Sequence, residues 1–230
     1  MTFEEKLEQF AELTVKVGAN VQKGQTLLIN TTTDTVEFTR LVVKKAYEVG
    51  AARVTVNFSD DVINRQFFDN APDAEFAKFP RWISEQRDEL IERKGALLWI
   101  DAADPDNLTG VPVEKLSAHQ KASGKALENY RDAVMNDKIA WSIIAVPSKK
   151  WAAKVFPNLK EEEQVPALWE AIFKTVHIGE GNVIDNWEQH LKNLDERAAI
   201  LNKKRYAKLH YTAPGTDLTV ELPDKHIWCT

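Results

Sequence analysis

The sequence lacks the residues that mark disulfide-rich, secreted or membrane-spanning proteins. Cys229 is the only cysteine among 230 residues, so neither an internal disulfide nor a cysteine zinc site can form within the chain. No apolar run approaches the roughly 20 residues that cross a bilayer. The opening segment is acidic and amphipathic, unlike a secretory signal. These features predict a reduced, cytoplasmic protein without membrane partners.

The chain also lacks an excess of positive charge. Lys and Arg number 30 against 35 Asp and Glu, which gives a net charge of -5 and argues against general nucleic-acid binding. Hydrophobic residues make up 43% of the chain, enough for a real core. The length fits one large domain, or one domain with a piece of another.

The familiar short motifs of catalysis are missing as well. The chain has no GxGxxG, no Walker loop and no GxSxG elbow, and none of its five histidines is paired at HxH or HExxH spacing. Cys229 has no evident histidine partner. We therefore assign no catalytic residue and no metal ligand from the sequence.

What is present is a regular alternation of strand and helix patterns. Apolar segments of strand length are separated by segments with helical periodicity, and crossovers of that length favour parallel strands. The expected strands are 26–30, 53–58, 96–100 and 139–146. The expected helices include 3–17, 34–49, 82–93 and 113–135, whereas 60–80 looks irregular. The sequence thus predicts an α/β domain with a mostly parallel sheet flanked by helices.

The second part of the chain is expected to be helical up to Arg205. Pro166 should open one helix and Asp185 should cap the next, by its spacing to Glu188. The pattern then changes to two strands, 206–211 and 218–222, around a Pro-Gly turn. We expect an N-terminal α/β domain over 1–205 and, over 206–230, the start of a second domain whose remainder is missing.

Candidate ligand-binding residues follow the expected strands, where open α/β sheets place their ligands. Thr32 and Asp34 lie in a Thr-rich loop without glycine, Asp101 and Asp104 follow the third strand, and Trp151 follows the fourth. The Thr-rich loop with its Asp, and also Asp101 and Asp104, could instead serve as turn and cap residues. We take Thr32, Asp34, Asp101 and Trp151 as the candidates for a substrate cavity. The acidic run 161–163 is expected to complement a helix N-terminus instead.

Tryptophan is abundant, with seven residues in the chain. Trp99 and Trp141 fall in expected strands, and Trp169 and Trp187 fall in helical apolar stripes. We expect these four and Trp82 to pack in the core.

Several segments, taken in order, resemble one known family. They are 137–157 (DKIAWSIIAVPSKKWAAKVFP), 17–25 (VGANVQKGQ), 101–105 (DAADP) and 215–223 (GTDLTVELP). The chain resembles the N-terminal domain of the thermophilic-type metalloaminopeptidases, peptidase family M29, which includes aminopeptidases T and S and PepS.

This resemblance implies an enzyme that removes N-terminal amino acids from peptides with a pair of divalent metals, zinc or cobalt. The family's metal ligands lie in its C-terminal domain, beyond this sequence, so none is carried over. The chain would then be a cavity-forming domain, inactive alone, in a homodimeric parent, with 206–230 as the start of a truncated catalytic domain. Two alternatives stay open: a stand-alone α/β binding module that has lost catalysis, and a small-molecule enzyme using Asp101 and Asp104.

Overall fold

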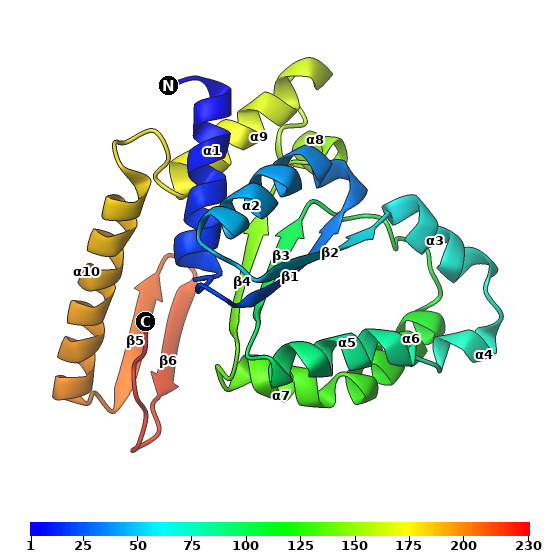
Figure 1. Ribbon diagram of the computed structural model, residues 1–230. Helices are drawn as coiled ribbons and strands as arrows, with labels where there is room; N and C mark the ends of the chain where they lie inside the picture. Colours follow the sequence, from blue (N-terminus) through cyan, green and yellow to red (C-terminus); the bar gives the residue numbers. More distant parts are fainter. The chain divides into compact units, whose positions relative to one another are not determined.

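The computed structural model describes all 230 residues, which form two compact units, Met1–Glu180 and Gly181–Thr230. The first unit is built on a four-stranded parallel sheet with the order β2-β1-β3-β4 (Figure 1). Its strands are β1 Thr26–Thr32, β2 Arg53–Ser59, β3 Ala96–Asp101 and β4 Ala140–Ala145. The predicted α/β fold with a parallel sheet is confirmed.

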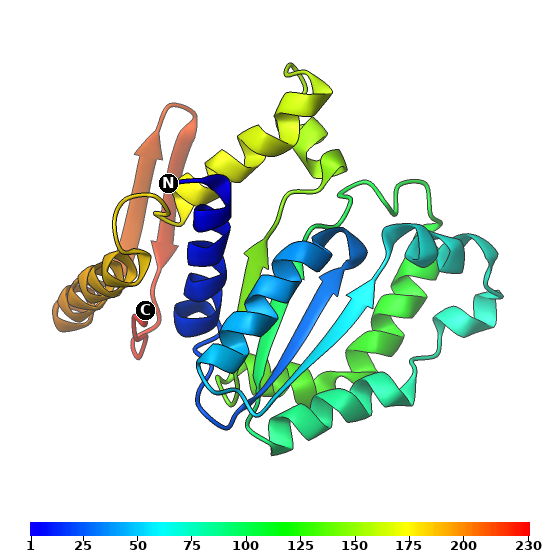
Figure 2. The same cartoon turned by 45° about the horizontal axis from the view of Figure 1, so that its top comes forward.

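Helices cover both faces of this sheet (Figure 2). α1 and α2 lie on one face, and α5 and α7 lie on the other. The helices of the first unit are α1 Phe3–Leu13, α2 Val36–Glu48, α3 Asp61–Asn70, α4 Asp73–Phe76, α5 Arg81–Glu92, α6 Val113–Ala126, α7 Glu128–Met135, α8 Lys149–Val155 and α9 Glu161–Thr175. α1 continues as a π-helical turn, Thr14–Gly18, and the 3-10 turn Thr33–Thr35 precedes α2.

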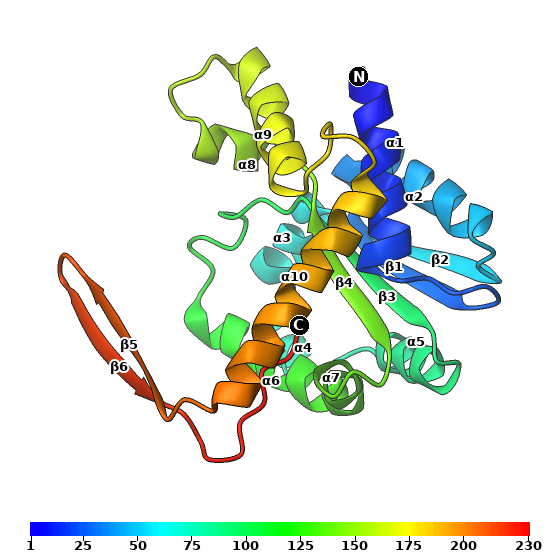
Figure 3. The same cartoon turned by 90° about the vertical axis from the view of Figure 1, so that its left-hand side faces the viewer.

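The second unit begins with the long helix α10, Val183–Lys204. It continues into an antiparallel hairpin, β5 Lys208–Ala213 and β6 Thr216–Glu221 (Figure 3). Gly215 takes the positive φ of 79° that its turn requires. Asn202 on α10 exchanges two hydrogen bonds of 2.8 Å with the backbone of Trp228, which ties the end of the chain to the helix. The domain boundary at 205/206 stays a prediction.

The core explains the apolar runs within the central strands. β1 and β3 have a neighbour on each side and helices on both faces, so Leu27, Ile29, Leu97 and Leu98 are all buried. α1 begins with a capping box: the Thr2 hydroxyl accepts from the Glu5 N–H, and the Glu5 carboxylate accepts from the Thr2 N–H.

Residues 60–80, expected to be irregular, form α3 and α4 instead. Asp60 starts α3, because its Oδ1 accepts the Ile63 N–H at 3.0 Å. Phe68 and Phe76 are then buried with Val111 in a small separate core. This aromatic packing over long sequence distances stabilises the helices without a regular apolar stripe.

Four other helix boundaries were also predicted wrongly. The strand pattern of β1 runs on through Thr32, so α2 begins at Val36 after Thr35 and Asp34 does not cap it. α9 begins at Glu161 and carries Pro166 in its interior, because a capping interaction between Lys160 and Glu163 starts the helix earlier. The cap of α10 is Asn182, whose Oδ1 accepts the Ile184 N–H at 2.9 Å. The segment predicted as one helix over 113–135 is divided at Leu127.

Three tryptophans expected in the core lie on the surface. Trp82, in the first turn of α5, is 72% exposed, and Trp99 and Trp141 are 39% and 41% exposed. β4 is an edge strand. On the sheet face that carries Trp99 and Trp141, α5 and α7 pack against Leu28 and Leu97. Trp169 is buried as predicted, and Trp187 is half-buried.

None of the helices combines the length and apolar character needed to span a membrane.

Candidate functional site

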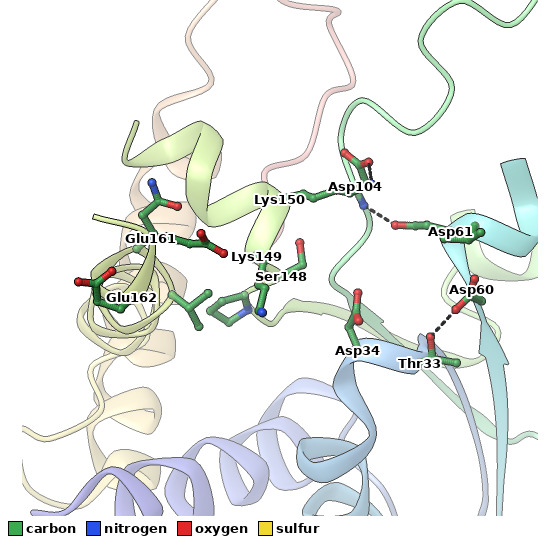
Figure 4. A pocket seen from close by; sticks show the side chains of 14 residues that line it. Thr33, Asp34, Asp60, Asp61, Asp104, Ser148, Lys149, Lys150, Glu161 and Glu162 are labelled. Atoms are coloured by element: carbon green, nitrogen blue, oxygen red, sulfur yellow. Dashed lines mark hydrogen bonds and ion pairs between the residues drawn. The ribbon is translucent and has the colours of Figure 1, made fainter. Parts of the chain in front are cut away.

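A pocket of about 850 Å³ opens at the carboxyl ends of the strands of the first unit (Figure 4). After β1 the chain adds β2 on one side of the sheet, and it then crosses over to add β3 on the other. Such a switch point leaves a crevice at the strand ends, where α/β proteins commonly bind ligands. The volume lies within the range of small-molecule sites, about 300–1,000 Å³.

The starts of four helical segments line this pocket: three follow β1, β2 and β4, where the chain leaves the sheet, and the fourth, α9, follows α8. They contribute Thr33 and Asp34 ahead of α2, Asp60 to Val62 at α3, Ser148 to Lys150 at α8, and Glu161 and Glu162 at α9. Carboxylates are stabilised near helix N-termini by the partial positive charge of unpaired N–H groups. The acidic lining therefore has a structural explanation as well as a possible functional one.

Asp60 is fixed at the start of α3. Its carboxylate accepts the Ile63 N–H at 3.0 Å and the Thr33 hydroxyl at 2.9 Å. The backbone bond from Ile63 is the main cause that lowers the pKa of Asp60, followed by the bond from Thr33. Asp60 is thus held as a carboxylate that joins the loops after β1 and β2.

Asp104 joins two other walls of the pocket. Its Oδ2 accepts from Lys150 Nζ at 2.6 Å, and its backbone N–H donates to Asp61 Oδ2 at 2.7 Å. The hydrogen bond with Lys150 is the main cause that lowers the pKa of Asp104 and raises that of Lys150. The loop after β3 is thereby tied to the starts of α3 and α8.

Negative charge dominates the pocket. Its lining includes the carboxylates of Asp34, Asp60, Asp61, Asp104, Glu161 and Glu162, against the ammonium groups of Lys149 and Lys150. The four helix starts offset part of this excess, at roughly half a charge each. The pocket is therefore better suited to a ligand that carries an ammonium group than to an anion.

The structure places some of the sequence-predicted candidates in the pocket lining and others outside it. Asp34 lines the pocket, and so does Asp104. Thr32 is buried at the end of β1 and is not among the lining residues. Asp101 also stays outside the lining, with its Oδ1 accepting the Ala103 N–H at 3.1 Å. Trp151 is half-buried in the first turn of α8, where its backbone N–H donates to Ser148.

Sequence reasoning missed Asp60, Asp61, Lys149 and Lys150. Asp60 and Asp61 follow β2 directly, as Lys149 and Lys150 follow β4. The rule that singled out residues after β1, β3 and β4 would also have selected these four.

These residues do not fit a metal pair. Nowhere in the chain do three His, Cys, Asp or Glu side chains converge in a way that could hold a metal ion. In the pocket, Asp60 is used as a helix cap and Asp104 as the partner of Lys150. The arrangement supports binding and orientation of a polar ligand.

Asp104→Asn should make the chain's stability less sensitive to acid. The pKa of Asp104 is lowered in the folded state, so its contribution is complete above the usual Asp pKa of about 4 and is lost as pH falls through the folded value. Urea midpoints at about pH 7 and about pH 3, above and below the usual Asp pKa, would be compared. The wild type should lose more stability between these two pH values than Asp104→Asn.

The control is Asp106→Asn, which removes the exposed pair with Lys154. Equal losses in wild type and Asp104→Asn would contradict the assignment.

Nearly the whole chain matches known proteins. The family described as thermophilic metalloprotease (M29) matches residues 3–230. Aminopeptidase AmpS of Bacillus subtilis is 44% identical over 227 residues, which are 99% of this chain and 55% of the relative. Aminopeptidase PepS of Streptococcus thermophilus is 42% identical, over 98% of this chain and 55% of the relative.

A solved structure also matches nearly the whole chain. Wild-type AmpT from Thermus thermophilus superposes with a TM-score of 0.91 at 37% identity, over 99% of this chain and 56% of that one. The chain therefore spans about half the length of the relatives it matches. On the family match and these identities, the chain belongs to peptidase family M29.

Proposed function

We propose that this chain is the cavity-forming N-terminal domain of a metal-dependent aminopeptidase and is inactive alone. The observation that carries the proposal is the acidic pocket at the strand ends, in a chain that spans about half of its aminopeptidase relatives. A peptide presents an α-ammonium group, which such a lining attracts. The pocket would wall one side of the substrate cavity and orient peptides in it.

The reaction chemistry would come from outside these residues. A divalent metal pair, when bound in the longer protein, supplies an activated water and a polarised scissile carbonyl. The side chains present here do not fit those metals, so their role is binding. Lys150, Asp104 and Asp61 would hold the cavity wall in shape through their mutual bonds. We also propose that the longer protein is a homodimer and that its substrates are peptides.

The role of the pocket is testable in a version of the protein extended through the C-terminal part that its relatives possess. Asp34→Asn removes one carboxylate that no hydrogen bond holds in place, so it changes the charge of the pocket with little change in structure. We expect KM for short peptides to rise about 2- to 5-fold with kcat unchanged, since a partly exposed ion pair contributes about 0.5–1 kcal/mol.

The matched control is Glu92→Gln, which removes an exposed carboxylate at the end of α5, outside the pocket. It should leave both constants unchanged. The effect of Asp34→Asn should also shrink in high salt, because salt screens partly exposed charges. Equal KM values for wild type, Asp34→Asn and Glu92→Gln would count against a role of this pocket in peptide binding.

A further inference from the structure

Arg87 is a buried cation without an anionic partner. It lies on α5 with only 6% of its surface exposed. Its Nη2 donates to Asn30 Oδ1 at 2.8 Å, and its Cζ lies 5.9 Å from the Trp99 ring and 5.5 Å from the Tyr130 ring. Burial lowers its pKa, and no carboxylate opposes this shift; the ring hydroxyl of Tyr130 alone does so. A buried charge is costly unless it is paired.

Two hydrogen-bond donors in this cluster lack an acceptor. They are Arg87 Nη1 and Asn30 Nδ2, and both atoms are buried. The Asn30 amide cannot turn over to change this, because its Oδ1 accepts from Arg87 at 2.8 Å and from Asn57 at 3.1 Å. Since Asn30 and Arg87 are bonded to each other, one small acceptor between their free donors could serve both.

A groove of about 320 Å³ runs beside this cluster, between α5 and the strands β1 and β2. It is lined by Leu28 and Thr55, each two residues before Asn30 and Asn57 on the same sheet face. Gln86 also lines it, and its Oε1 accepts from Asn57 at 2.7 Å. The charged lining residues are Arg53, Arg93 and Glu89, so the groove carries an excess of positive charge.

We propose that Arg87 and Asn30 bind a small monovalent anion, either chloride or a short carboxylate such as formate, that enters along this groove. Its negative charge would neutralise the guanidinium, and it would accept hydrogen bonds from both free donors. Neighbouring aromatic rings and leucines would exclude water and favour a weakly hydrated ion. The site lies on the α5 face of the sheet and is independent of the proposed aminopeptidase role.

The test uses the 230-residue chain and measures its melting temperature. Chloride and formate are each compared with isethionate, an anion too bulky for the site, at one fixed ionic strength. A ligand that binds only the folded state raises the melting temperature, by about 3 °C at ten times its dissociation constant. A rise in chloride but not formate would assign the site to halide, and a rise in both would assign it to small anions in general.

Three variants separate the site from general salt effects. Arg87→Met removes the cation, and Asn30→Asp supplies a carboxylate from the chain itself, so both should lose the dependence on chloride. Asn30→Asp should in addition melt higher than the wild type in isethionate, which keeps the test decisive if Arg87→Met folds poorly. Arg81→Met, on the same helix but exposed and paired with Glu85, should respond to chloride as the wild type does.

A bromide soak of crystals would locate the ion by its anomalous signal. A bromide peak within hydrogen-bond distance of Arg87 Nη1 is the expected result. The proposal would be overturned by a water molecule there in crystals grown with the anion, or by equal melting temperatures of the wild type in chloride, formate and isethionate.

Discussion

Phe173→Ala should lower the free energy of unfolding by about 3–5 kcal/mol, as expected for a buried aromatic residue truncated in a core. Phe173 is 1% exposed and its ring stacks on Trp169 with centroids 5.2 Å apart. It also meets Phe10 on α1 at 6.3 Å, and Trp169 meets Phe38 on α2 at 6.1 Å. This aromatic cluster is what fixes α9 against α1 and α2.

The same change should affect the pocket, because the first turn of α9 supplies Glu161 and Glu162 to its wall. Urea denaturation of the purified chain would measure the loss of stability. Trp82→Ala is the control, since that tryptophan is 72% exposed and its removal should cost less than about 0.5 kcal/mol. A loss below about 1 kcal/mol for Phe173→Ala would show that the cluster is not the anchor described here.

Gly95→Ala should destabilise the chain by about 2–3 kcal/mol through overpacking. Gly95 lies between α5 and β3, where its N–H donates to Leu90 O at 2.9 Å. A Cβ at this position would lie 2.3 Å from Leu90 Cδ1 and 2.9 Å from the backbone oxygen of Thr26. Leu90 can rotate away only within a packed core, and the Thr26 carbonyl cannot move without disturbing β1.

Gly124→Ala provides the comparison. This glycine lies inside α6, and an added Cβ would meet only Nη2 of Arg131, at 3.1 Å, an exposed side-chain end that can shift by a few tenths of an ångström although it donates to the Gly124 carbonyl. Because Ala is the better helix former by about 1 kcal/mol, the substitution should be neutral or stabilising. Melting temperatures of the two variants should therefore move in opposite directions or differ by several degrees. Equal stability of the two variants would contradict the close approach of α5, β1 and β3 at Gly95.

The parallel sheet could be predicted because its central strands are buried on both faces. A run such as Ala96 to Ile100 has no polar residue, and few other structures suit a run of that length. α3 and α4 could not be predicted in this way. Their stability depends on Phe68 and Phe76 meeting Val111, a contact between segments far apart in the sequence.

The position of the candidate site was predictable in outline, since parallel strands end at one edge of a sheet. Which strand ends meet depends on the order β2-β1-β3-β4, and strand order cannot be read from local patterns. The same limit explains the tryptophans: Trp141 has an apolar strand pattern around it, yet β4 is at the edge and leaves the side chain partly open. The bond of Asp104 to Lys150 likewise depends on the tertiary structure.

The most direct test of the central claim is hydrolysis of leucyl-p-nitroanilide, with and without added cobalt or zinc. The purified 230-residue chain would be assayed beside the version extended through the C-terminal part that its relatives possess. We predict metal-dependent activity in the extended version and none in the short chain. Metal-dependent activity in the short chain would contradict the account, because it would place the catalytic centre among residues to which we assign only the role of a cavity wall.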